Sequence, residues 1–194
     1  MPGKLRERVE IEVPRERQLL FGGLLIMIIG LSIFTKVHVV ISLIGIFSGL
    51  VVMFGLLAAK SLNRWTALFL VSTVATSVTG FFFPFHGFTP AIGVGIISLA
   101  VLAVAIVARY LRHLVGTWRW LYVVAAMVAL YLNVFVLIVQ LFQKVPALRA
   151  LAPTQSEPPF LVAQLFTLLL FVVLAIVSAI RFRIGPLHTS ARPA

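Results

Sequence analysis

Six long apolar stretches dominate the sequence and leave little of the chain for anything else. They lie at about 19–34, 39–59, 65–83, 91–110, 120–142 and 160–180. The hydrocarbon core of a bilayer is about 30 Å thick, so a crossing helix needs roughly 17–25 mostly apolar residues. We therefore predict an all-α integral membrane protein, a compact bundle of six transmembrane helices over residues 19–181. Polar tails at 1–18 and 182–194 flank the bundle, and no soluble domain is expected.

The first two stretches are separated only by Thr35-Lys36-Val37-His38. One bent apolar segment from Gln18 to Ala59 would hold about 42 residues, twice what a single crossing uses. The polar interruption therefore predicts a hairpin turn between two spans.

The distribution of Lys and Arg predicts the orientation of the bundle, because these residues are enriched on the cytoplasmic side. Thirteen of the 16 basic residues fall in the two tails and in the connections after the second and fourth spans. The other three are Lys36, Lys144 and Arg149. We expect a multi-pass protein of a bacterial inner membrane, with both termini in the cytoplasm.

The composition excludes several classes of function. The chain is 61% apolar and carries a net charge of +11 in short clusters between apolar runs, so the charge indicates membrane topology and not a nucleic-acid face. Cysteine is absent, and all five acidic residues lie outside the spans. A buried proton relay, an intramembrane metal site and a haem between paired histidines are therefore unexpected. We predict no cofactor, no metal and no catalytic residue, which makes an enzyme the third hypothesis.

Amides in the last two spans are the first candidate ligand-binding groups. Asn133 and Gln140 are seven residues apart on one helix, and the next span carries Gln164. An amide at membrane depth needs a partner, so these side chains are expected to face the interior. Gln140 and Gln164 are expected at similar depth, where they would either form an interhelical hydrogen bond or line a cavity.

Two connections on the outer side supply the remaining candidates. The phenylalanine-rich hairpin between the third and fourth spans contains His86, and the longer connection before the sixth span contains Gln155 and Glu157. Ser156 is predicted to cap the sixth helix, with Glu157 in its first turn, where a carboxylate favours the positive helix end. The alternative is a functional carboxylate in an outer vestibule near His86 and Gln155.

Small residues at helical spacing predict close packing of the helices. We assign this role to Gly23, Gly30, Gly45, Gly49 and Gly95. Packing within one bundle is the favoured interpretation, and a dimer face is the alternative.

Two function classes remain open. The first is a module that binds or transports a small neutral or lipid-like molecule through an outward-facing cavity. The second is a non-catalytic accessory or scaffold subunit of a larger membrane complex. The expected partners are membrane lipids, and either a membrane protein or a second copy of the chain.

Overall fold

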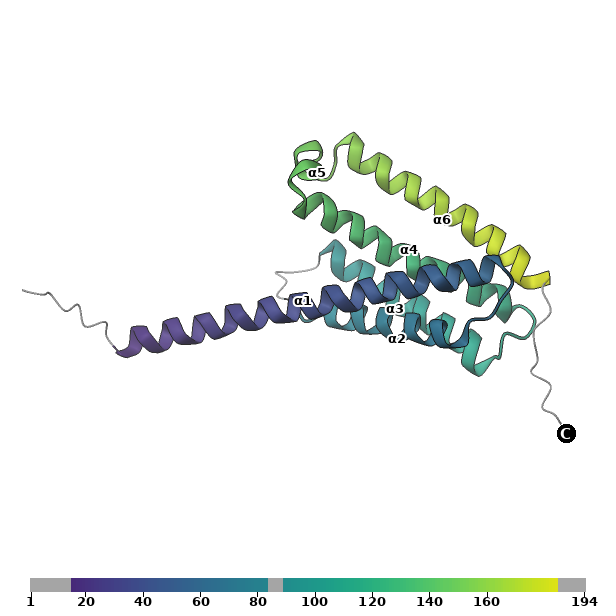
Figure 1. The fold of residues 1–194 in the computed structure, drawn as a ribbon, viewed down its shortest axis with the longest axis horizontal. Helices are drawn as coiled ribbons and strands as arrows, with labels where there is room; N and C mark the ends of the chain where they lie inside the picture. Colours follow the sequence, from purple (N-terminus) through teal and green to yellow (C-terminus); the bar gives the residue numbers. More distant parts are fainter. Residues whose placement is uncertain (1–14, 84–88, 185–194) are drawn as a thin grey trace, which may run out of the picture. The chain divides into compact units, whose positions relative to one another are not determined.

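The computed structural model describes the backbone of residues 15–83 and 89–184 and the side chains of residues 30–83 and 89–182. These ranges form helices and short connections, without a strand (Figure 1). The helices are α1 (Arg15–Leu57), α2 (Asn63–Gly80), α3 (Pro90–Ile106) with the π-helical turn η1 (Val107–Leu111), α4 (Trp118–Lys144), α5 (Pro146–Leu151) and α6 (Pro158–Ile184).

Four helices in the described ranges are long and apolar enough to cross a membrane. They span Gly30–Leu57, Pro90–Leu111, Trp118–Lys144 and Pro158–Phe182. The described part of the protein is therefore all-helical, with helices of membrane character. Helix α2, at the predicted third span, falls outside this group, since it begins with Asn63 and Arg64 and carries six serines and threonines along its length.

Helix α1 differs from the two spans expected for this region. Residues 35–38 are helical, so the predicted hairpin turn is absent and α1 is one helix of 43 residues. Lys36 and His38 are tolerated because a helix satisfies its own backbone whatever side chains it carries. The chain nevertheless divides into two compact units between Val37 and His38, at the place of the expected turn.

The second unit, residues 38–194, holds the described core. Its buried residues come from the carboxyl-terminal part of α1 and from α2, α3, α4 and α6. Tyr122, Phe69 and Leu102 are among its fully buried side chains. Helix α4 packs against both α3 and α6, so it is the central element of this unit.

Three glycines, two on α1 and one on α3, lie where neighbouring side chains come close to the helix backbone. A Cβ on Gly49 would lie 2.6 Å from Leu130 Cδ1 and 2.9 Å from the Phe69 ring. A Cβ on Gly95 would lie 2.9 Å from the Phe81 ring, and one on Gly45 would lie 3.3 Å from the Thr73 hydroxyl. A larger residue at any of these three positions would press on a neighbouring side chain.

The two remaining glycines lie in the first unit. Gly30 has nothing within 4 Å of its Cβ position, so it packs against no described neighbour. Gly23 is helical, and its surroundings lie outside the described side chains.

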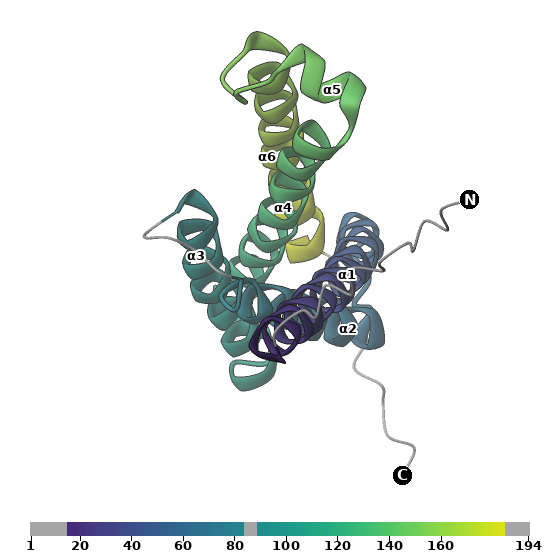
Figure 2. The ribbon, with the colours of Figure 1, turned by 90° about the vertical axis from the view of Figure 1, so that its left-hand side faces the viewer.

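Helices α4 and α6 form an antiparallel hairpin, and the short helix α5 lies across the end where they are joined (Figures 1 and 2). Pro146 begins α5 and Pro158 begins α6, positions where a missing N–H costs no helical hydrogen bond. A small apolar cluster of Phe142, Ala152 and Phe160 fixes the connection to both helices.

Candidate functional site

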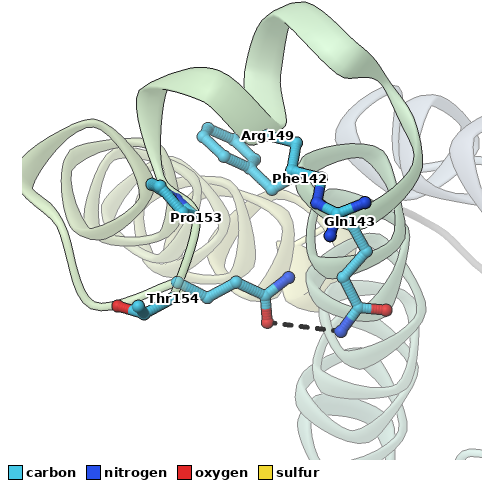
Figure 3. Close-up of a pocket in the computed structure, with 6 residues that line it drawn as sticks. Phe142, Gln143, Arg149, Pro153 and Thr154 are labelled. Atoms are coloured by element: carbon cyan, nitrogen blue, oxygen red, sulfur yellow. Dashed lines mark hydrogen bonds between the residues drawn. The ribbon is translucent and has the colours of Figure 1, made fainter.

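A pocket of about 440 Å³ lies at the joined end of α4 and α6 (Figure 3). Its walls are the last turn of α4, helix α5 and the start of the connection to α6. The lining residues are Phe142, Gln143, Arg149, Pro153, Thr154 and Gln155. Two amides, a hydroxyl and a guanidinium thus line the pocket beside the largely buried ring of Phe142.

Gln155 joins the two sides of this pocket. Its Oε1 accepts a hydrogen bond from Gln143 Nε2 at 3.4 Å, the dashed line of Figure 3, and its Nε2 donates to the Val139 carbonyl at 3.0 Å. The residue has a left-handed backbone with φ of 61°. Such a conformation is uncommon for a residue with a side chain, so neighbouring contacts must hold it in place.

Glu157 supplies those contacts. Its Oε1 accepts hydrogen bonds from the Thr154 amide at 3.1 Å and the Thr154 hydroxyl at 2.9 Å. Its Oε2 accepts from the Ser156 amide at 3.1 Å, and the hydroxyls of Thr154 and Ser156 are hydrogen-bonded to each other. The carboxylate therefore closes the connection into a tight loop beside the pocket.

These contacts also determine the charge of the loop. Desolvation raises the pKa of Glu157, but the amides of Thr154 and Ser156 and the Thr154 hydroxyl together outweigh it and hold this pKa below its ordinary value. Glu157 is consequently ionised at neutral pH.

The expected capping arrangement at α6 is shifted by one residue. The Glu157 carbonyl accepts the first helical hydrogen bonds, from the amides of Phe160 and Leu161 at 3.1 and 3.2 Å. Glu157 and not Ser156 therefore holds the capping position. The first two helical residues are prolines without an N–H, so the Glu157 carboxylate has no donor to bind there and turns back toward Thr154.

The amides inside the bundle do not gather around this pocket. Asn133 Nδ2 donates to Thr73 Oγ1 of α2 at 3.2 Å, and Gln164 Nε2 donates to the Phe135 carbonyl of α4 at 3.3 Å. The half-buried Gln140 makes no hydrogen bond to any described residue. The expected bond between Gln140 and Gln164 is therefore absent: Gln164 Nε2 donates to a backbone carbonyl instead, and its buried Oε1 has no partner in the described part of the protein.

The predicted site residues thus separate into three groups. Gln155 lines the pocket, and Glu157 shapes the loop beside it. Asn133, Gln140 and Gln164 lie along α4 and α6 outside it. His86 lies outside the described residues.

Sequence reasoning did not select Phe142, Gln143 and Arg149 as ligand-binding candidates. All three lie within 13 residues of Gln155, and Pro146 between them signals a short reversing helix. The short helix that Pro146 begins was the sequence feature that could have identified these residues, since it brings the end of α4 close to the connection to α6.

No family model, curated protein or solved structure matches the chain. The function must therefore be argued from the residues and their geometry.

Proposed function

We propose that this protein is a multi-pass protein of a bacterial inner membrane that binds a small neutral, lipid-like molecule at the outer membrane interface. The site is the pocket of Gln143, Arg149, Thr154 and Gln155. The six-span count and the cytoplasmic position of both termini belong to the same proposal, supported by the 13 to 3 distribution of basic residues.

The carrying observation is the loop built by Glu157. An ionised carboxylate closed by three hydrogen bonds holds Gln155 in a left-handed conformation at the wall of a polar cavity. Ordered loops that expose unusual polar groups are where binding residues concentrate.

The chemistry of the walls indicates the class of ligand. Arg149 suits a phosphate oxygen, the Gln143 and Gln155 amides offer donors and acceptors, and Phe142 offers an apolar surface. A zwitterionic lipid headgroup meets all three requirements while remaining neutral overall. We favour binding of the lipid over its transport through the protein. Asn133 and Gln164 are hydrogen-bonded within the helices and do not extend the pocket inward.

Single-cysteine variants test this proposal directly, since the chain has no cysteine of its own. Gln143→Cys places a thiol in the pocket wall, and Ala147→Cys places one on an exposed position of α5 outside it. Both are reconstituted in phosphatidylcholine nanodiscs with increasing phosphatidylethanolamine, and the rate of maleimide labelling is measured. We expect phosphatidylethanolamine to slow labelling at position 143 and to leave position 147 unchanged.

Equal rates at both positions over the whole lipid range would overturn the proposal. Removal of Arg149 provides a second readout, because Arg149→Gln in the Gln143→Cys background should abolish the protection. Protection that survives this substitution would place the lipid elsewhere.

An accessory subunit of a larger membrane complex is the second candidate. The observation that favours it is that Asn133 finds its partner inside the bundle, on Thr73, as a structural amide does. Co-purification with a defined membrane complex, lost in a variant of the exposed α6 face such as Phe166→Ser, would support this function.

A further inference from the structure

A buried arginine lies at the other end of the bundle. Arg109, in the π-helical turn η1 that ends α3, is only 8% exposed. Its guanidinium donates through Nη2 to Asn63 Oδ1 at 2.6 Å and to Ser61 Oγ at 3.3 Å. The carbon of the guanidinium also lies 5.2 Å from the centre of the Tyr122 ring. Every one of these partners is neutral.

The positive charge has no carboxylate within reach in the described part of the protein. The sequence contains no acidic residue between Glu16 and Glu157. Glu157 is held by Thr154 and Ser156 at the far end of α4 from Tyr122. A buried charge without a counter-charge is costly, so an anion that reaches Arg109 would gain a strong interaction.

A cavity leads to this arginine. It has a volume of about 490 Å³ and is lined by Ser61, Asn63, Arg64, Ala67, Arg109, Tyr110, His113 and Leu114. Arg64 and His113 are exposed residues of this lining, so the cavity brings a second cation and an imidazole to the same site as the buried guanidinium.

The start of α2 faces the same cavity. The first helical hydrogen bond of α2 runs from the Thr66 amide to the Leu62 carbonyl, so the amides of Asn63, Arg64 and Trp65 precede it, and no side chain caps them. Such amides and the positive end of the helix dipole favour an anion. They add to a site that Arg109 and the cavity already define.

We propose that this cavity binds the phosphate of an anionic lipid headgroup, with Arg109 and Arg64 as its cationic ligands. The exposed apolar side chains of Trp65, Leu111 and Val115 beside the lining residues provide the surface along which acyl chains would lie. Inorganic phosphate shares the recognising chemistry but lacks the acyl chains. The inference does not rest on the pocket of Gln143.

The test uses the full-length protein in a neutral detergent, with phosphatidylglycerol as the probe. Binding is followed by native mass spectrometry, and stability by the midpoint of thermal unfolding, Tm. At a lipid concentration about a hundredfold above Kd, we expect Tm to rise by roughly 5–10 °C.

Arg109→Gln removes the charge and keeps a donor for Asn63. We expect it to weaken phosphatidylglycerol binding at least about tenfold, because a charge-assisted hydrogen bond is lost. Without lipid its Tm should equal or exceed that of the parent, since an uncompensated charge has been removed. Arg112→Gln is the matched control: Arg112 is exposed, stacks on Trp118 and does not line the cavity, so this variant should keep the lipid response.

An unchanged lipid response in Arg109→Gln would overturn the proposal. If that variant does not fold, Arg64→Gln decides, because Arg64 is exposed and its loss should weaken lipid binding while leaving Tm without lipid unchanged.

Two further experiments distinguish a lipid phosphate from other anions that could bind Arg109. If inorganic phosphate alone reproduces the rise in Tm, the lipid assignment is wrong. If changing Glu7, Glu10, Glu12 and Glu16 to glutamine lowers Tm without lipid in the parent but not in Arg109→Gln, the chain supplies its own anion and the proposal fails. We expect neither result.

Discussion

The role of an individual side chain in this protein depends on the residues that it contacts. Three residues illustrate this: Glu157, Gly49 and Asn133. Glu157 contacts its own loop, whereas Gly49 and Asn133 contact residues that are distant along the chain. Their substitution gives the sharpest tests at the scale of the residue.

The loop before α6 should open in acid. Because hydrogen bonds lower the pKa of Glu157, its contribution to loop order is complete above the ordinary value of 4.5 and is lost as the pH falls through the lowered pKa. Hydrogen exchange at the amides of Thr154 and Ser156, corrected for intrinsic rates, should therefore accelerate as the pH falls below 4.5 and through the lowered pKa of Glu157. Glu157→Gln should show fast exchange at every pH, and slow, pH-independent exchange in the parent would contradict the assignment.

Gly49 should tolerate no larger side chain. Its Cβ position lies within 3 Å of Leu130 and Phe69, both buried in the core, so Gly49→Ala forces these side chains to move. We expect a loss of about 1–3 kcal/mol in the free energy of unfolding, measured by titration with a denaturing detergent in mixed micelles. Gly30→Ala is the control and should be neutral or slightly stabilising, since nothing lies within 4 Å of that position.

At the scale of the helix, hydroxyl groups of α2 bind partners on two other helices. Ser42 of α1 donates to Thr76, and Asn133 of α4 donates to Thr73. Other hydroxyls of α2, such as Ser72 and Ser77, donate to carbonyls of their own helix. A helix that is less apolar than its neighbours is thereby accommodated inside the bundle.

The contact between Asn133 and Thr73 should be modest but specific. Asn133→Leu is expected to cost about 0.6 kcal/mol in the free energy of unfolding, the average for a hydrogen bond between membrane helices. The double-mutant cycle with Thr73→Val should recover this coupling. Gln140→Leu is the control and should show no coupling with either residue, and a coupling equal to that of Asn133 would contradict the structure.

The continuity of α1 has a direct consequence for topology. A helix of 43 residues is about 65 Å long at 1.5 Å per residue, twice the thickness of a hydrocarbon core. The proposed six-span count requires a break in α1 near Val37 at the outer surface of the membrane, and the structure, in which α1 is continuous, does not contain that break. With such a break, a Val37→Cys variant should react with an impermeant maleimide added outside intact cells, while Val52→Cys, buried in the core, should not. Protection of position 37 would favour a single crossing.

At the scale of the whole molecule, the proposed orientation rests on the distribution of charge. With an even number of crossings, both tails lie on the side that holds 13 of the 16 basic residues. A reporter fused after Ala194 and one fused before Met1 should both read cytoplasmic. Opposite readings would mean that α1 crosses once, and would place the five basic residues of the amino-terminal tail outside.

Much of the architecture followed from the sequence alone because it depends on local chemistry. Apolar length predicts α3, α4 and α6 within a few residues of their ends, and Pro90, Pro146 and Pro158 begin helices because proline suits a first turn. At Gly45, Gly49 and Gly95 a Cβ would lie within 3.3 Å of a side chain from another element, a closeness that a residue without a side chain permits. The interruption at Thr35-Lys36-Val37-His38 did not produce the expected turn, because polarity alone does not break helical hydrogen bonds.

Only the tertiary structure decided which polar groups meet. Asn133 could have faced any of several helices, and its partner is Thr73, 60 residues away. Gln164 reached a backbone carbonyl and not Gln140, and Glu157 turned to its own loop because two prolines follow it. Arg109 counted in the sequence as one more cytoplasmic cation, although it ends an apolar stretch. The fold buries it under Asn63 and Tyr122, because the depth of a charge is set by the helices packed around it and not by its place in the chain.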